Sequence, residues 1–319
     1  MGGLLAELGK KIAERWLTLL VLPGALYLAV LAAARTMGHA HPFAMDLLSR
    51  RIDGLAGAAQ SGSAGRTAIV LLALLLASAA AGVIAQAAGS LIERLWLAAD
   101  WQRWPLPGRR LAGSLVARRR ASWQAASDRY AQRREESAAA LARAHRAGGR
   151  PPQTGDGLEA AYGSLVRIAH ELPERPTWMG DRLAAVAIRL DRDFALDLAT
   201  LWPYVWLYVP DVIRTEVTAT RDALSRATTL AGWGLLYLAV GALWWPGLPL
   251  AAVILLTAWR RARTATNAYA TLVEAAARLH TPDLARHLGL DLSGPLTRQV
   301  GAQLTHLLQT GQITAAPGR

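Results

Sequence analysis

The sequence predicts an all-α integral membrane protein, with about four membrane helices and an α-helical cytoplasmic domain. Three apolar stretches without Asp, Glu, Lys or Arg carry this prediction, at 16–34, 67–92 and 227–259. A bilayer core of roughly 30 Å needs about 20 apolar helical residues to cross it. Between the second and third stretches, residues 93–226 form the only segment long enough for a sizeable water-exposed core.

The composition excludes several classes of chemistry. The chain has no cysteine, which removes disulfides, thiolate zinc sites, iron–sulfur clusters and thiol catalysis. Its formal net charge is +12, and only Lys10 and Lys11 are lysines among its 35 basic residues. In a membrane protein such a charge reflects the positive-inside bias or attraction to anionic lipid, so nucleic acid is not the expected partner. The abundance of Ala, Leu, Gly and Arg suggests a GC-rich bacterial genome.

The first two apolar stretches predict two transmembrane helices within residues 16–92, joined by a short external loop. Residues 1–15 form an amphipathic lead that carries basic residues. The lead and the stretch 16–34 fit either a secretory signal, with small residues at 32–34 for cleavage, or a retained anchor. The anchor is favoured because the apolar run is longer than a signal core of about 7–15 residues. Pro23 and Gly24 predict a kink in this helix.

Small residues recur along one side of the second stretch. Ser78, Gly82, Ala85 and Gly89 form small-xxx-small pairs, which allow another helix to approach closely. Any Ala-rich span also produces such pairs by chance. We keep these four residues as candidate helix-packing residues.

The third stretch predicts a membrane hairpin at 227–259. The sequence Pro-Gly-Leu-Pro at 246–249 divides it into two arms, because proline lacks the amide donor that a continuous helix needs. The hairpin either spans the bilayer fully or is re-entrant, and both arrangements return the chain to the side it left. Basic residues are more numerous on the side that holds both termini and residues 93–226, which places that side in the cytoplasm. We therefore expect a multi-pass protein of a bacterial inner membrane.

The cytoplasmic domain, at 93–226, contains a predicted long helix at 109–146, where proline is absent. Apolar residues recur there at helical spacing beside clustered arginines. Arginine near anionic headgroups contributes on the order of 1 kcal/mol each. The candidate lipid-binding residues are Arg118, Arg119, Arg120, Arg133 and Arg134. The alternative is a solvated helix with ordinary surface charge.

Residues 260–319 predict a cytoplasmic helical tail with a disordered end beyond 311. Apolar residues repeat at helical spacing on both sides of Pro282, which we expect to interrupt the first helix. These amphipathic helices need a surface to cover, either in the domain at 93–226 or on a partner.

We find no motif that predicts catalysis, a metal or a cofactor. The chain lacks a Gly-rich phosphate loop, a dinucleotide fingerprint and the HExxH pattern. The densest carboxylate group, Asp191, Asp193 and Asp197, is interleaved with Arg189 and Arg192, which favours ion pairing over metal binding. The apolar stretches carry no ionisable acid or base, which argues against a proton-coupled carrier acting alone.

Three short segments form a pattern. They read PTWMGDRL at 176–183, FALDL at 194–198 and LWP at 201–203. This resembles a family of bacterial, mainly actinobacterial, multi-pass membrane proteins with PTxxGN or PTxxGD, then YGLD and WPRL, which has no assigned activity. Here Phe194–Ala195 replaces Tyr-Gly, and Tyr204 replaces the Arg. The resemblance covers about 173–290 and implies a bacterial membrane protein without indicating any catalysis.

The same residues have a structural interpretation. Thr177 is placed to cap a helix, Asp181 lies in the first turn, and Gly180 permits another backbone to approach closely. Asp197 is expected to bond a helix terminus or to pair with an arginine such as Arg182. Asp181, Asp197 and Trp202 are therefore candidate structural residues.

Together these features predict a non-enzymatic, membrane-anchored scaffold or accessory subunit. Its basic domain would bind anionic lipid and a protein partner, or associate with itself. The alternative is a homo-oligomeric pore or membrane-disrupting effector, lined by the face of Ser78 and Gly82.

Overall fold

The computed structural model describes residues 21–60, 63–148, 155–292 and 294–311. These residues form helices and connecting turns, with no strand among them, so the all-α prediction is confirmed for the described chain. The predicted lead at 1–15, the start of the first apolar stretch and the predicted disordered end at 312–319 lie outside the described residues.

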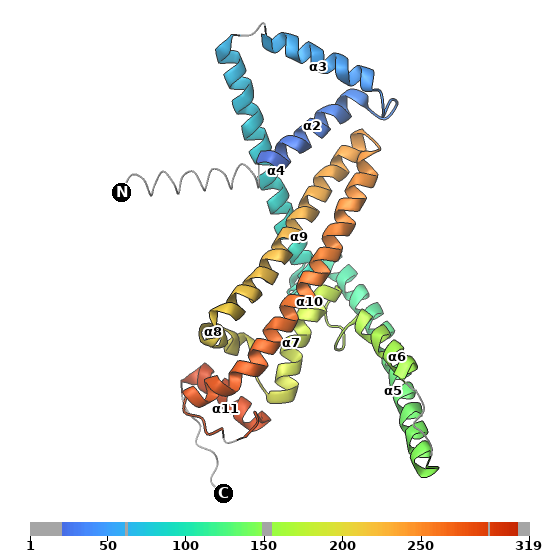
Figure 1. The fold of residues 1–319 in the computed structure, drawn as a ribbon, viewed down its shortest axis with the longest axis vertical. Helices are drawn as coiled ribbons and strands as arrows, with labels where there is room; N and C mark the ends of the chain where they lie inside the picture. Colours follow the sequence, from blue (N-terminus) through green and yellow to red (C-terminus); the bar gives the residue numbers. More distant parts are fainter. Residues whose placement is uncertain (1–20, 61–62, 149–154, 293, 312–319) are drawn as a thin grey trace. The chain divides into compact units, whose positions relative to one another are not determined.

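The helices follow one another along the chain as Figure 1 shows. They are α2 (Leu22–Met37), α3 (Met45–Gln60), α4 (Ala64–Leu97), the 3₁₀ turn η2 (Trp101–Arg103), α5 (Leu106–Arg146), α6 (Gly155–Ile168), α7 (Trp178–Phe194), α8 (Leu198–Tyr208), α9 (Asp211–Leu243), α10 (Gly247–His287) and α11 (Arg298–Thr310).

The chain divides into two compact units. Unit 1 comprises Met1–Glu93 and Ala223–Ala262, and unit 2 comprises Arg94–Asp222 and Arg263–Arg319.

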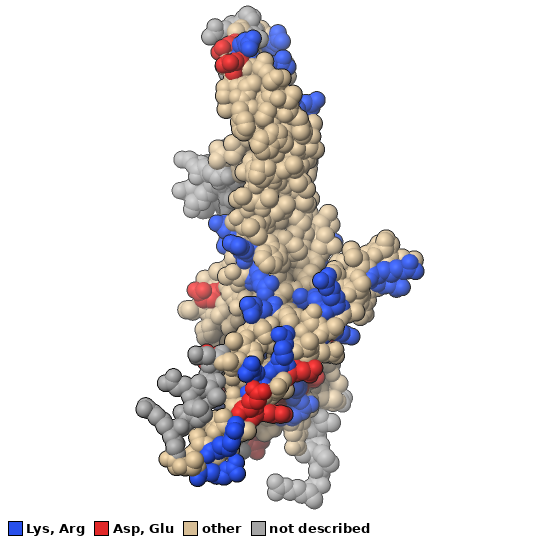
Figure 2. Space-filling view, turned by 90° about the vertical axis from the view of Figure 1, so that its right-hand side faces the viewer, with Lys and Arg blue, Asp and Glu red and all other residues tan. Residues whose placement is uncertain are grey.

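Within the described residues, one helix is long and apolar enough to cross a membrane by length and composition, Gly65–Leu97 in α4. The helix Leu22–Met37 is apolar but shorter. Large side chains of α4 are widely exposed, among them Ile69, Leu72 and Leu76. On the face shown in Figure 2, a wide area carries no Lys, Arg, Asp or Glu. The uncharged arms of α9 and α10 are each shorter than the roughly 20 residues of a full span.

Small residues hold unit 1 together. Ser78, Gly82, Ala85 and Gly89 are all buried, on one face of α4. A Cβ atom added at Gly24 would lie 2.0 Å from the Ser78 carbonyl oxygen, and one added at Gly232 would lie 2.0 Å from the Ala85 carbonyl oxygen. Helices α2 and α9 therefore approach α4 backbone to backbone, as small residues at an interface allow.

The helices α9 and α10 form an antiparallel hairpin (Figure 1). The turn between them is Trp244–Pro246, shorter than the predicted break at 246–249. Pro249 lies in the first turn of α10, where a missing amide donor costs no helical hydrogen bond. Pro23 lies in the first turn of α2 as the structure describes it, and the predicted kink there depends on residues before 21, which lie outside the described residues.

Pro282 does not interrupt its helix, in contrast to the sequence prediction. Helix α10 continues through Pro282 to His287. The side chain of Thr281 donates to the Ala277 carbonyl oxygen at 2.5 Å, whereas the carbonyl that loses its helical donor at Pro282 is that of Arg278. Leu284 and Ala285 are buried beyond it, so packing in the core of unit 2 supports the continued helix.

The core of unit 2 lies among α7, α8, α10, α11 and the start of α9. Its fully buried members include Leu190, Leu196, Leu201, Val205 and Leu304. Gly301 of α11 has no room for a side chain, because an added Cβ would lie 1.9 Å from the Phe194 carbonyl oxygen. Helix α6 packs along α5, where the rings of Tyr130 and Tyr162 lie 5.6 Å apart.

Candidate functional site

Asp181 organises the polar part of unit 2. Asp181 is 5% exposed, and its carboxylate accepts hydrogen bonds from three donors. Oδ1 accepts from the backbone N–H groups of Glu174 at 2.9 Å and Arg175 at 2.8 Å. Oδ2 accepts from Nη2 of Arg119 at 2.7 Å. A buried carboxylate needs such partners, because burial without them is strongly unfavourable.

Two neighbours of Asp181, Thr177 and Gly180, attach the first turn of α7 to the end of α4. The Thr177 hydroxyl accepts from the Gly180 N–H at 3.0 Å and donates to the Trp96 carbonyl at 2.5 Å. An added Cβ at Gly180 would lie 2.4 Å from the Leu97 carbonyl oxygen. The predicted cap at Thr177 and the predicted close approach at Gly180 are both confirmed. We call Asp181, Arg119, Thr177 and Gly180 the Asp181 network.

Side chains from two other segments fix the loop that precedes α7. Arg119 donates to the Ile168 carbonyl at 2.7 Å, and Arg120 donates through Nε to the Pro173 carbonyl at 2.7 Å. The indole of Trp123 donates to the Ala169 carbonyl at 3.1 Å. The indole of Trp101 donates to the Glu174 carbonyl at 3.0 Å. The loop is thus held at three of its carbonyl oxygens, and the last residue of α6 at a fourth.

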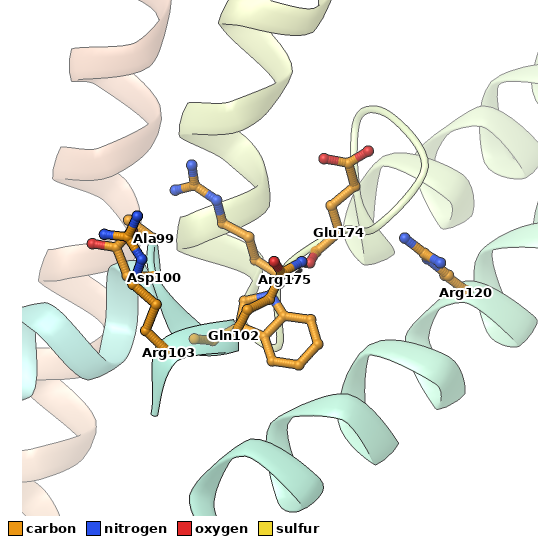
Figure 3. A pocket seen from close by; sticks show the side chains of 8 residues that line it. Ala99, Asp100, Gln102, Arg103, Arg120, Glu174 and Arg175 are labelled. Atoms are coloured by element: carbon orange, nitrogen blue, oxygen red, sulfur yellow. Dashed lines mark hydrogen bonds between the residues drawn. The ribbon is translucent and has the colours of Figure 1, made fainter. Parts of the chain in front are cut away.

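A polar pocket of about 420 Å³ lies beside this loop (Figure 3). Its walls come from the turn at 99–103, from α5 and from the loop before α7. The lining residues are Ala99, Asp100, Trp101, Gln102, Arg103, Arg120, Glu174 and Arg175. Burial lowers the pKa of Arg175, and the nearby carboxylates of Asp181, Glu174 and Asp100 partly oppose this. This pocket is the candidate functional site.

A second polar cluster lies deeper in unit 2. Arg182 is 4% exposed and donates to neutral acceptors, Oδ1 of Asn267 at 2.8 Å and Oγ1 of Thr271 at 2.9 Å. Its burial lowers its pKa, and the charge of Arg189 adds to the effect. His170 packs against Trp178, and burial together with the charges of Arg182, Arg189 and Arg263 lowers the pKa of His170 to about 4.

The predicted lipid-binding arginines have different surroundings. Arg118, Arg133 and Arg134 are exposed on α5, and Arg133 pairs with Glu136 at 3.3 Å. Arg119 and Arg120 are bound to the loop before α7 and so take part in the internal structure of unit 2.

The predicted structural residues lie at two places. Asp197 caps α8, accepting from the Ala199 N–H at 3.1 Å and from the Thr200 hydroxyl at 2.5 Å. These hydrogen bonds lower the pKa of Asp197. Arg182 is not its partner. Trp202 packs against Trp206, with ring centroids 5.8 Å apart, and lines an apolar pocket of about 310 Å³.

The sequence predictions missed Asp100, Arg103, Glu174 and Arg175 as pocket residues. A local signal existed for the first two, because charged and aromatic residues directly follow the apolar stretch that becomes α4. No local signal connects them to Glu174 and Arg175, which lie more than 70 positions further along the chain and are held at the pocket by Asp181, Trp101 and Arg120.

Among the described residues, no group of three or more His, Cys, Asp or Glu side chains could hold a metal ion. The sequence predicted ion pairing in the carboxylate group near Asp193, and Asp193 pairs with Arg192 at 3.2 Å and Arg278 at 2.8 Å. Comparisons with family models, curated proteins and solved structures give no match to this chain.

Proposed function

We propose that this chain is a membrane-anchored scaffold or accessory subunit, and that its basic helical part binds anionic lipid and a protein partner. One observation carries the lipid part of the proposal. Helix α5 has ten arginines and three acidic residues, and one of its faces combines exposed leucines with exposed arginines.

That face follows from helical periodicity. Positions separated by 3, 4, 7 or 11 residues share one side of a helix. The α5 stripe, as we define it, consists of Leu111, Leu115, Arg118, Ser122, Arg129 and Arg133, all exposed. Leu111 is 63% exposed and Leu115 is 41% exposed. The buried residues Ala112 and Val116 lie on another face of the same helix, whereas the buried Ala126, four positions after Ser122 and three before Arg129, lies at the edge of the stripe.

Leucine beside arginine on one exposed face is typical of helices that lie on a membrane surface. The apolar side chains enter the headgroup region while the guanidinium groups stay with the phosphates. The stripe changes which arginines carry the lipid proposal, since Arg118, Arg129 and Arg133 share it. Arg134 projects about 100° away from Arg133 around the helix axis.

Membrane anchoring is supported by α4, which is long and apolar enough to cross a bilayer. We propose that the region of α2 and the α9–α10 hairpin complete a multi-pass bundle with both termini in the cytoplasm of a bacterium. The close backbone contacts of Gly24 and Gly232 with α4 support a packed bundle. No observation favours the pore alternative, because its lining residues, Ser78 and Gly82, are buried within unit 1.

A single-cysteine label tests the lipid part, since the chain has no cysteine of its own. The variant Ser122→Cys carries an environment-sensitive dye at the centre of the α5 stripe, with the full chain in lipid nanodiscs. We expect a blue shift when phosphatidylglycerol is added to phosphatidylcholine, weakened by salt. Arg118→Gln, Arg129→Gln and Arg133→Gln together should abolish the shift.

The matched control removes the same charge elsewhere. Arg50→Gln, Arg51→Gln and Arg66→Gln change exposed arginines of α3 and the start of α4. This triple variant should keep the shift. Equal loss in both triple variants would mean that only net charge matters, and would contradict the proposal for α5.

Native mass spectrometry of the gently extracted protein tests the partner part. A stoichiometric second protein would support an accessory subunit. A defined homo-oligomer without another protein would contradict that part and favour the pore alternative.

A further inference from the structure

We infer that the pocket at 99–103, 120 and 174–175 binds a phosphoethanolamine group, with its phosphate on the arginines and its ammonium on the carboxylates. The inference rests on the proposed membrane anchoring, which would place this pocket at headgroup depth. The first lining residue, Ala99, follows α4 by only two positions.

The pocket is held open by contacts that need no ligand. Trp101 and Arg120 bind successive parts of the loop, at the carbonyls of Glu174 and Pro173. The Asp181 carboxylate accepts hydrogen bonds from the backbone N–H groups of Glu174 and Arg175. A pre-formed site has less ordering entropy to lose on binding. Its volume of about 420 Å³ is in the range of small-molecule sites.

The pocket contains positively and negatively charged side chains that can bind a ligand. Among the described residues, Arg103, Arg120 and Arg175 form no ion pair, and neither do Asp100 and Glu174. Arg120 uses Nε on the Pro173 carbonyl, and Arg175 uses Nη1 on the Leu97 carbonyl at 3.4 Å. Within the described ranges, the remaining guanidinium donors and the two carboxylates have no hydrogen-bond partner. Figure 3 shows Arg103 and Arg120 on opposite sides of the Glu174–Arg175 segment.

This combination selects for a ligand with both charges. A phosphate alone would meet two carboxylates, and an amine alone would meet three guanidinium groups, so each would suffer like-charge repulsion. Guanidinium groups bind phosphate oxygens through paired N–H donors. A primary ammonium can donate hydrogen bonds to Asp100 and Glu174, whereas a quaternary ammonium has no proton to donate.

The test uses the full chain in detergent, with native mass spectrometry of retained lipid. Equal amounts of phosphatidylethanolamine, phosphatidylcholine and phosphatidylglycerol are offered. We expect phosphatidylethanolamine to be retained at least about fivefold over phosphatidylcholine. Asp100→Asn with Glu174→Gln should reduce that ratio to near one, and Arg103→Gln should reduce retention of the lipid. In the part of the chain that the structure describes, these three side chains form no hydrogen bond or ion pair, so the variants should remain folded.

A control and a competition complete the experiment. Glu136→Gln on α5 should leave the ratio unchanged. Soluble phosphoethanolamine that displaces the lipid would identify the free compound as a ligand of the same chemistry, and its failure to do so would identify the lipid headgroup. Equal retention of all three lipids, unaffected by the Asp100 and Glu174 variants, would overturn the inference. The dye shift at Ser122 does not involve these residues, so it separates failure of this pocket from failure of the proposed function.

Discussion

Arg119 of α5 and Asp181 of α7 form an ion pair at 2.7 Å, although they are 62 positions apart in the sequence. Only 4% of the Asp181 side chain is exposed, compared with 21% of that of Arg119. The pair joins two helices and, through Asp181, the backbone that forms one wall of the pocket. It therefore connects the fold of unit 2 with its candidate site.

Removing the charge of Asp181 should destabilise unit 2. In Asp181→Asn the amide cannot pair with Arg119, which is left partly buried. Breaking a buried pair costs about 3–5 kcal/mol, and the partial exposure of Arg119 lowers our expectation to about 2–3 kcal/mol. Urea unfolding of the full chain in mild detergent measures this loss of unfolding free energy. Asp211→Asn, at a side chain that is 90% exposed, should change stability by less than about 0.5 kcal/mol.

Gly180→Ala should destabilise the chain by about 1–3 kcal/mol, because its Cβ would overlap the Leu97 carbonyl oxygen. The matched control is Gly163→Ala within α6, where nothing lies within 4 Å of the added Cβ. That control should stabilise the helix by roughly 0.5–1 kcal/mol. Thermal unfolding of the two variants should give opposite signs, and equal signs would show that Gly180 is not a close contact.

Ala195→Gly should stabilise the protein. Ala195 ends α7 with a φ of 54°, in the left-handed region that disfavours residues with a Cβ atom. Relief of that cost, about 1–2 kcal/mol, exceeds the extra entropy of an unfolded glycine, so we expect a gain of about 0.5–1 kcal/mol. Ala187→Gly, at an exposed position inside α7, should instead cost about 0.5–1 kcal/mol. Thermal melts of both variants decide the sign.

Gly232→Ala should weaken unit 1. The added methyl group would lie 2.0 Å from the Ala85 carbonyl oxygen, so α9 must move away from α4. We expect a loss of about 1–3 kcal/mol, seen as a lower melting temperature in detergent by circular dichroism. Gly65→Ala, where an added Cβ meets nothing within 4 Å, serves as the control and should melt no lower than the wild type.

His170 should make stability depend on pH. Its pKa is about 4 in the folded chain, against 6.5 as its ordinary value, because burial and the charges of Arg182, Arg189 and Arg263 oppose protonation. The unfolded state therefore binds the proton more readily, and stability falls as the pH decreases from 6.5 towards 4. His170→Phe keeps a ring against Trp178 and should make the melting temperature depend less on pH between 6.5 and 4. An unchanged slope would exclude His170 as the cause.

Local patterns predicted the parts of the site that depend on neighbours in the sequence. The cap at Thr177 and the close contact of Gly180 followed from the residues at 176–182 alone. The partner of Asp181 did not, because Arg119 reaches it from another helix. The predicted helix break at Pro282 was wrong for a related reason. Burial of Leu284 and Ala285 favours a continued helix, although proline cannot donate the backbone hydrogen bond at its own position. The sequence shows that Ala195 departs from Tyr-Gly, but only the three-dimensional structure shows its left-handed backbone conformation.

Label position around α5 tests the central claim most directly. Ser122→Cys and Gln124→Cys place the same spin label on exposed positions about 200° apart around the helix. In nanodiscs containing phosphatidylglycerol, we expect that the label at 122 becomes accessible to oxygen dissolved in lipid, whereas the label at 124 stays accessible to water-soluble nickel reagents. Equal accessibility of the two labels to the nickel reagent would mean that α5 is solvated on all sides and would contradict the proposed lipid contact.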